Sequence, residues 1–295
     1  MATTLGRLGV WSILDNLNAA QAAEFARRVE ALGYGALWVA ETVGRDPFTL
    51  IAWMAAHTTR LVFATGIANI YARDPTTMKA IAKTVAEMAP GRFVLGLGVS
   101  HSHLAQKVRS HEYSNKLVAT MRAYLEAMDK ALYMGPAPAE EPPLVLAALR
   151  DHMLRLSAEK TRGAHSYLVP PEHTARARAT LGKEAWLCPE QMVLLETDAS
   201  KAREVARKHR GVYLRLPNYQ NNLKEYGFED VDFLNGGSDR LVDAIVAWGD
   251  EDAIRARVAA HYKAGADHVC IQPFRPNGEP GQDHALLEAL APALE

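Results

Sequence analysis

Short apolar runs alternate with longer amphipathic segments along the whole chain of 295 residues. The apolar runs predict eight buried strands, which lie at 8–13, 36–40, 61–67, 92–98, 144–149, 165–169, 186–196 and 268–272. Between them, apolar side chains recur at helical spacing, as Ala22, Phe25 and Val29 do within 19–32 before Gly33 ends that helix. Further helices are expected at or near 47–57, 75–90, 114–134, 151–161, 171–182, 199–210, 240–248, 252–264 and 285–294.

Eight strands separated by helices favour a (β/α)8 TIM barrel of the α/β class. A doubly wound open sheet is the main alternative, but it usually carries a glycine-rich phosphate loop after its first strand, and residues 14–18 read Leu-Asp-Asn-Leu-Asn. Residues 216–237 predict an insertion with short helices before the last strand, which we call the excursion. Within it, residues 219–223 either shape a substrate pocket or pack as a loop. The Pro-rich segment 135–143 is interpreted as a loop, so we expect a single domain over 1–295.

Composition limits the classes of function. Hydrophobic residues make up 48% of the chain and charged residues 23%, as in ordinary globular proteins, and the formal net charge is -1. This balance gives no general attraction to nucleic acid or to an anionic membrane. Cys188 and Cys270 lie in apolar runs without zinc or redox spacing, which indicates buried, reduced thiols. With no signal-like N-terminus and no membrane-spanning run, we expect a cytoplasmic protein acting on a small molecule.

The stretch 61–75, LVFATGIANIYARDP, holds the first candidate site. It begins as an apolar strand, becomes small at Thr65 and Gly66, and continues as a polar loop up to Pro75. Glycine in a strand marks a bulge or a place where a ligand approaches the backbone. A kinked strand that leads into a polar loop is typical of the rim of a barrel active site.

Ligand sites of such barrels lie at the carboxyl ends of the strands. The residues in these positions are Trp11, Ser12, Glu41, Thr42, Thr65, Gly66, Ile67, Val99, Ser100, His101, Val169, Pro170 and Gln272. Trp11 and Trp38 either line the mouth or pack in the core. His101, His103 and His111 lack a carboxylate at metal-ligand spacing, so we expect no metal. A rim without a hydrolase motif or an obvious metal centre suits an organic cofactor that brings its own chemistry.

Three segments form a set of motifs in register: GALWVAE at 35–41, ATGI at 64–67 and GRFVLGLG at 91–98. Together they resemble the bacterial luciferase-like superfamily, whose members are flavin monooxygenases and deazaflavin (coenzyme F420) oxidoreductases. Two later segments, GAHSYLVPPEHT at 163–174 and AGADHVCIQ at 264–272, are similar to the actinobacterial F420-dependent branch. The resemblance implies a luciferase-like barrel, usually a homodimer, with the cofactor ring at the strand ends.

The same resemblance implies a cofactor site for coenzyme F420, with FMN as the alternative. The implied cofactor-binding residues are Glu41, Thr65, Gly66, Ile67, Val99, Ser100, His101, Val169, Pro170, His173 and Thr174. In relatives the bulge at 65–67 often contains a non-proline cis peptide and bends the ring; a plain strand is the alternative. Residues 170–174 open a helix whose free N–H groups suit a phosphate, with Thr174 as an extra donor; a simple capping turn is the alternative.

Glu41 and His101 are the candidate catalytic residues. A carboxylate at the end of the second strand can hydrogen-bond the cofactor or relay a proton, and the alternative is an ion pair at the rim with Arg45 or Arg73. His101 can donate an N–H to a phosphate or ring oxygen, beside the Ser100 hydroxyl. The alternative for His101 is a loop side chain in water.

One departure from the family bears on the reaction. Sugar-phosphate dehydrogenases of the F420 branch have a histidine directly after the second-strand carboxylate and a glutamate after the fourth-strand GxG, whereas this chain has Thr42 and Val99. The acid-base pair for oxidising an alcohol is therefore missing. The remaining groups suit hydride transfer between the deazaflavin and a small organic substrate, as a reductase of C=C or C=N bonds. An FMN-dependent monooxygenase and a non-catalytic flavin-binding homologue are the alternatives.

Overall fold

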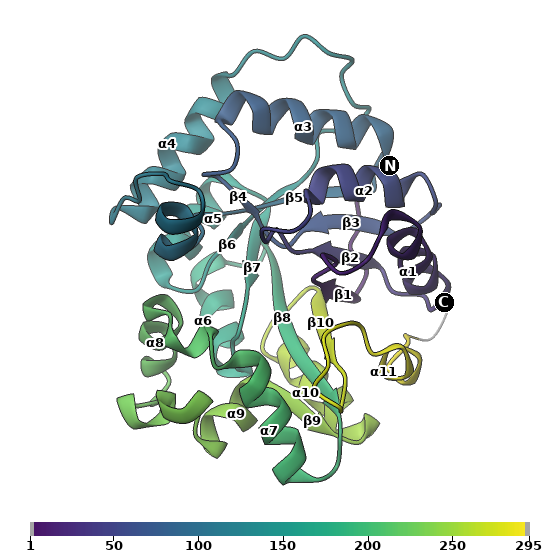
Figure 1. Ribbon diagram of the computed structural model, residues 1–295. Helices are drawn as coiled ribbons and strands as arrows, with labels where there is room; N and C mark the ends of the chain where they lie inside the picture. The colour runs from purple at the N-terminus through teal and green to yellow at the C-terminus, as the bar shows by residue number, and fades with distance from the viewer. Residues whose placement is uncertain (1–2, 293–295) are drawn as a thin grey trace.

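Parallel strands close into a barrel with helices around it (Figure 1). The computed structural model describes residues 3–292, without the side chain of Arg210. In order around the barrel, the strands are β1 (Leu8–Ser12), β2 (Ala36–Val39), β3 (Val62–Thr65), β5 (Phe93–Gly98), β6 (Leu144–Ala147), β7 (Gly163–Ser166), β8 (Trp186–Leu195) and β10 (Val269–Phe274). β10 pairs with both β1 and β8, which closes the ring. The predicted (β/α)8 TIM barrel is confirmed.

The helices follow the predicted periodicity, and several begin at capping side chains. They are α1 (Ala19–Ala31), α2 (Pro47–Ala55), α3 (Pro75–Met88), α4 (Leu117–Lys130), α5 (Asp151–Lys160), α6 (Pro171–Leu181), α7 (Ala199–Arg210), α10 (Glu251–Lys263) and α11 (His284–Ala289). Asn18 and Gln21 form a capping box at α1, and the Asp74 carboxylate accepts from Thr76 N at the start of α3. Gly33, with a φ of 84°, follows the end of α1 as expected.

β3 breaks at its carboxyl end. The peptide bond between Gly66 and Ile67 is cis, and the chain re-enters the sheet as β4 (Ala68–Asn69), which pairs with the end of β5. Thr65 Oγ1 donates to Gly96 O at 2.8 Å and accepts from Gly96 N at 2.9 Å. A Cβ on Gly96 would lie 2.1 Å from Thr65 O, so only glycine permits this approach. The bulge that the sequence predicted is present, and so is the cis peptide.

The sixth barrel strand lies earlier in the sequence than predicted. The apolar run at 165–169 indicated a strand, but β7 ends at Ser166. Leu168 has a φ of 60°, which turns the chain out of the sheet. Tyr167, Leu168 and Val169 are therefore apolar because they pack beyond the strand end and not because they extend it.

A further strand stands where the sequence predicted the end of a helix. The helix expected near 240–248 is α9 (Asp239–Ile245), and it is followed directly by β9 (Val246–Gly249). β9 pairs in parallel with residues 192–195 of β8. A continuous apolar run is compatible with a buried strand and with a buried helix. The sequence pattern therefore could not show that α9 ends at Ile245 and a strand begins at Val246.

The excursion before the last strand contains short helices, as predicted. These are η2 (Tyr213–Arg215), α8 (Pro217–Lys224) and η3 (Asp230–Gly236). Its apolar side chains pack with those of β8 and β9 into a second hydrophobic cluster, separate from the main core. This second cluster includes Leu214, Leu223, Phe233, Met192 and Val246. An ion pair between Arg176 of α6 and Glu225 holds the excursion against the barrel, and Figure 1 shows α8 beside α6.

Alternate positions of the strands fill the barrel interior below the strand ends. This interior cluster includes Trp38, Ala64, Val94, Val145, Cys188 and Cys270. The two cysteines are free and buried, as expected, and burial raises the pKa of the Cys270 thiol well above its usual range, so that thiol is inert. Within residues 3–292, the helices are too short or too polar to cross a membrane.

Candidate active site

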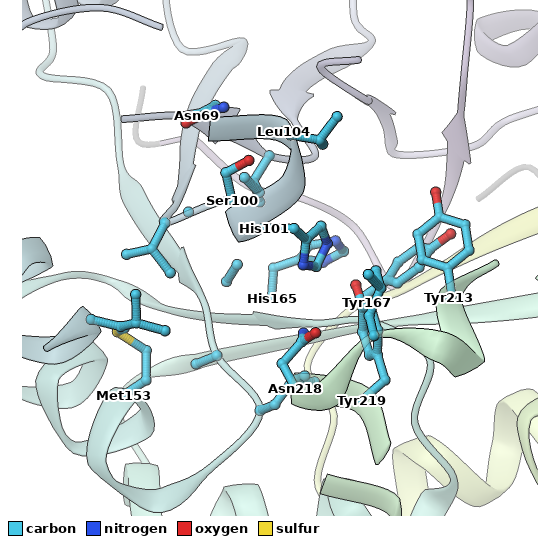
Figure 2. A pocket seen from close by; sticks show the side chains of 18 of the residues that line it. Asn69, Ser100, His101, Leu104, Met153, His165, Tyr167, Tyr213, Asn218 and Tyr219 are labelled. Carbon is cyan, nitrogen blue, oxygen red and sulfur yellow. The ribbon is translucent and has the colours of Figure 1, made fainter. Parts of the chain in front are cut away.

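A cavity of about 1240 Å³ lies at the carboxyl ends of the barrel strands. Residues at or just beyond the carboxyl ends of β1 through β7, from η1 (Leu104–Val108) and from the excursion line it. Figure 2 shows Ser100 and Leu104 above His165 in this cavity, with Asn218 and Tyr219 of the excursion below. Since barrel enzymes bind their ligands at this edge, the cavity is the candidate active site.

The predicted site residues divide into two groups. Those that line the cavity are Trp11, Glu41, Thr42, Gly66, Ile67, Val99, Ser100 and His101. Those that lie outside its lining are Ser12, Thr65, Val169, Pro170, His173, Thr174 and Gln272. The strand ends of the first half of the barrel therefore converge on the cavity as expected, whereas the start of α6 does not reach it.

The start of α6 differs from the phosphate corner that the sequence predicted. Thr174 is fully buried, and its hydroxyl donates to His261 Nδ1 at 2.8 Å. His173 is also buried, and its Nε2 donates to Leu149 O at 2.6 Å. Burial lowers the pKa of His173 to about 4, which keeps the ring neutral at ordinary pH. Both side chains therefore hold α6 against its neighbours.

The Glu41 carboxylate is engaged on both oxygens. Arg73 Nη1 donates to Oε1 at 2.7 Å, and the backbone N–H of Asn69 donates to Oε2 at 2.6 Å. Arg109 Nη2 lies 3.7 Å from Oε1. Of the two arginines considered as ion-pair partners, Arg73 pairs with Glu41, while Arg45 donates to a backbone carbonyl. Glu41 thus fastens the loop that carries β4, and its side chain is only 4% exposed.

His101 presents an imidazole ring to the cavity beside a turned backbone. Ser100 has a φ of 60°, and Tyr113 Oη donates to its carbonyl at 3.0 Å. The His101 ring lies 5.6 Å from the ring of Tyr219, measured between centroids. Burial lowers the pKa of His101, which favours the neutral ring. A neutral imidazole offers one N–H donor and one acceptor, so His101 can hydrogen-bond a ligand or transfer a proton.

Four aromatic rings form a second wall of the cavity. Trp11 and Tyr167 lie 5.1 Å apart between ring centroids, and Tyr167 lies 5.5 Å from Tyr213 and 6.1 Å from Tyr219. Trp11 Nε1 donates to Gly66 O at 2.9 Å, which links this wall to the bulge. The sequence left open whether the excursion shapes a pocket or packs as a loop. The cavity lining supports a pocket, because the tyrosines of the excursion line it. Flat apolar surfaces of this kind suit a planar ring.

His165 is a cavity residue that the sequence analysis did not select. It lies in β7, is 2% exposed, and stacks on Trp38 with 4.6 Å between ring centroids. Trp38 itself is a core residue and does not line the mouth. His165 Nδ1 donates to Cys188 O at 2.7 Å, whereas its buried Nε2 has no hydrogen-bond partner. A histidine in a segment predicted to be a buried strand was the one signal in the sequence.

Two exposed arginines also escaped the sequence analysis. Arg150 follows β6 and Arg215 belongs to the excursion, and both line the cavity. Arg176 lines it as well, but its guanidinium is held by Asp151 and Glu225. Within residues 3–292, no group of three or more His, Cys, Asp or Glu side chains is placed to hold a metal ion. The charged groups at this mouth therefore favour an anionic part of a ligand.

A mycobacterial protein shares part of this sequence. A protein of Mycobacterium tuberculosis, named as a candidate coenzyme F420-dependent oxidoreductase, is 30% identical over 171 residues. The match covers 58% of this chain and 46% of that protein, so it spans less than half of the relative's length.

Two solved structures resemble the fold across almost the whole chain. An F420-dependent secondary alcohol dehydrogenase, in complex with an F420-acetone adduct, has a TM-score of 0.77 and 14% identity and covers 100% of both chains. The oxygenating constituent of 3,6-diketocamphane monooxygenase from Pseudomonas putida, in complex with FMN, has a TM-score of 0.71 and 14% identity. It covers 97% of this chain and 96% of its own. The model of the family described as luciferase-like monooxygenase matches residues 2–268, and this chain belongs to that family.

Proposed function

We propose that this protein is a coenzyme F420-dependent oxidoreductase that transfers a hydride between the deazaflavin and a small organic substrate. The observation that carries the proposal is the bulge at Gly66 and Ile67, which lines a cavity of about 1240 Å³ at the strand ends. This volume exceeds the roughly 300–1,000 Å³ of ordinary ligand pockets. It therefore leaves room for a substrate beside a tricyclic ring.

The residues around the cavity fit such a cofactor. Ile67 offers an apolar surface for one face of the ring, and Ser100 and His101 offer donors for its oxygens. Arg150 and Arg215, which form no ion pair among the described residues, would hold the phosphate. The bound deazaflavin would supply the carbon that gives or accepts the hydride.

The surroundings of Thr42 and Val99 support reduction of a polarised double bond. Thr42 donates its hydroxyl to Asp15, and Val99 is apolar, so neither position supplies the acid-base pair that oxidising an alcohol requires. The neutral ring of His101 can donate a hydrogen bond to the nitrogen of a C=N bond, or to the oxygen of a carbonyl group that activates a C=C bond. We therefore propose a reductase of C=C or C=N bonds. His101 would polarise the acceptor through this hydrogen bond while water supplies the proton that accompanies the hydride, and Glu41 would position the ring seat through Asn69.

Other properties belong to the same proposal. We propose that residues 1–295 form a single domain, that the protein works in the cytoplasm, and that it assembles as a homodimer. Light scattering of the purified protein is expected to give twice the mass of one chain. A mass equal to that of one chain would contradict the dimer.

An FMN-dependent luciferase-like monooxygenase is the second candidate. It is favoured by the likeness to the FMN complex of 3,6-diketocamphane monooxygenase, which has a TM-score of 0.71. A non-catalytic flavin-binding homologue is the third, because the acid-base pair is missing. Turnover with any acceptor would exclude the third candidate.

Equilibrium binding separates the first two candidates. We expect the purified protein to quench F420 fluorescence with a dissociation constant at least about tenfold lower than that for FMN. Arg150→Gln with Arg215→Gln is expected to weaken F420 binding about tenfold, because each phosphate contact of this kind contributes about 1 kcal/mol or less at an exposed site. Arg27→Gln, an exposed arginine on α1 outside the cavity lining, is the matched control. Tight FMN binding with negligible F420 binding would reject the proposed cofactor.

Gly98→Ala tests whether the cofactor ring lies against Ile67, the contact that we call the ring seat. A Cβ on Gly98 would lie 2.4 Å from Cδ1 of Ile67, so the glycine makes room for that side chain. The substitution is expected to push Ile67 into the cavity and weaken cofactor binding about tenfold. The loss of stability should be only about 1 kcal/mol, because a flexible side chain can move. Titration with F420 and FMN measures the effect, and Gly135→Ala, in a distant loop, is the control. Unchanged affinity would show that the ring does not lie against Ile67.

A further inference from the structure

The bottom of the cavity contains a polar atom without a partner. His165 lines the cavity, and its Nε2 is buried from solvent and forms no hydrogen bond. Leaving a buried polar group unpaired costs about as much as losing a hydrogen bond outright, and folded proteins seldom tolerate it without a reason. A ligand in the cavity that satisfies this atom supplies such a reason.

The other ring nitrogen fixes the chemistry of Nε2. Nδ1 lies 2.7 Å from the carbonyl oxygen of Cys188, which can only accept, so Nδ1 carries the proton. Burial lowers the pKa of His165 to about 4, so the ring does not take up a second proton at ordinary pH. Nε2 is then a lone-pair acceptor, and it can be satisfied only by an N–H or O–H of the ligand.

The His165 ring is also held firmly in place. It stacks on Trp38 at an interplanar angle of 15°. Trp38 Nε1 in turn donates to His268 Nε2 at 3.0 Å, and His268 Nδ1 donates to Gly6 O at 2.9 Å. Each ring in this series is fixed by the next, so the direction of the His165 lone pair is set before any ligand arrives.

Several other polar groups of the cavity can donate hydrogen bonds. Ser100 and His101 each offer a donor, and the exposed arginines Arg150 and Arg215 can only donate. Such groups recognise oxygens of a ligand. A flavin or deazaflavin ring carries two carbonyl oxygens with one imide N–H between them, so it needs an acceptor for that single N–H.

We propose that His165 accepts a hydrogen bond from the imide N–H of the cofactor ring and so sets how the ring enters the barrel. This proposal rests on the proposed function, because it requires a flavin-type cofactor. His165 is then a binding residue for the cofactor, alongside the bulge at Ile67 that faces the same cavity.

Two changes, one in the cofactor and one in the protein, test the contact. The protein is titrated with whichever of F420 and FMN it binds, and with the same molecule methylated at the imide nitrogen. Wild-type protein should prefer the unmethylated cofactor roughly tenfold or more, since methylation leaves the buried acceptor unpaired. His165→Phe, which keeps a flat ring on Trp38, should reduce this preference to about twofold.

His173→Phe is the matched control. His173 is equally buried, donates through Nε2 to a backbone carbonyl, and has an unpartnered Nδ1, but it does not line the cavity. This variant should keep the wild-type preference. An equal preference in wild-type protein and His165→Phe would overturn the proposal.

A spectroscopic measurement on wild-type protein covers the case in which His165→Phe fails to fold. With ¹⁵N-labelled histidine, the Nε2 resonance of His165 should move upfield when F420 or FMN is added, because an acceptor nitrogen becomes hydrogen-bonded. An unmoved resonance with cofactor bound would overturn the inference alone. If wild-type protein binds neither cofactor, the proposed function fails and this inference fails with it.

Discussion

Arg73→Met is expected to destabilise the protein by about 3–5 kcal/mol and to abolish measurable cofactor binding. The substitution removes the cation that lies 2.7 Å from Glu41 while leaving that carboxylate nearly buried. The buried carboxylate then keeps only the more distant Arg109, 3.7 Å from Oε1, and losing the closer cation is costly. The affected residue also fastens the backbone of Asn69 beside the bulge. Urea unfolding measures the loss of stability, and titration with F420 and FMN measures binding.

Two comparisons make this prediction specific. Arg122→Met removes an exposed arginine that is bidentate to Glu159, and it should cost no more than about 1 kcal/mol. The double variant Glu41→Gln with Arg73→Met should be more stable than Arg73→Met alone, because the amide leaves no charge and still accepts from Asn69. A double variant that is less stable than Arg73→Met would contradict this account.

The protein is expected to unfold on mild acidification, between about pH 5 and pH 4. Burial lowers the pKa of His165, His173 and His268 to about 4 and that of His261 to about 3. The unfolded chain has ordinary histidine pKa values near 6.5, so it binds more protons than the folded protein below that pH. The stabilisation is therefore complete above about pH 6.5 and is lost as the pH falls towards 4.

The size of this effect follows from the same shifts. At pH 5 each buried histidine costs about 2 kcal/mol, so the four together cost on the order of 8 kcal/mol, comparable with the total stability of an ordinary domain. Urea unfolding from pH 7 to pH 5 should show the decline. His173→Phe should reduce the slope by about 1.4 kcal/mol per pH unit. A free energy of unfolding that stays constant from pH 6.5 to 5 would refute the prediction.

The fold could be predicted wherever the period of the pattern was unambiguous. Helices such as α1 and α3 carry caps and regular apolar spacing, and the strands before 100 lie within two residues of their predicted bounds. β9 was missed because both faces of a buried parallel strand are apolar, so the strand has no period of its own. β7 was misplaced because its own residues are small or polar, whereas the apolar run 167–169 lies beyond its end. Whether Leu168 continues a strand or leaves it depends on a positive φ that no neighbouring residue signals.

The candidate site could be predicted only where it follows the strand ends. The rule that barrel sites lie there led to Glu41, Ile67 and His101. It did not identify Tyr213 or Arg215, because their place in the cavity depends on how the excursion folds back over the barrel. Thr174 was selected for its position at a helix start, but its hydroxyl turns inward to His261, a contact across 87 residues that local sequence does not encode.

The separation of the two hydrophobic clusters has a consequence for how this protein can change. The tyrosines at the mouth stand on the smaller cluster of the excursion, whereas the ring seat belongs to the barrel strands. Mutations distant in structure and sharing no partners act almost independently. A directed-evolution library restricted to 216–218 and 220–224, which leaves Arg215 and the cavity tyrosines unchanged, can therefore explore new substrates while the inherited cofactor seat stays intact.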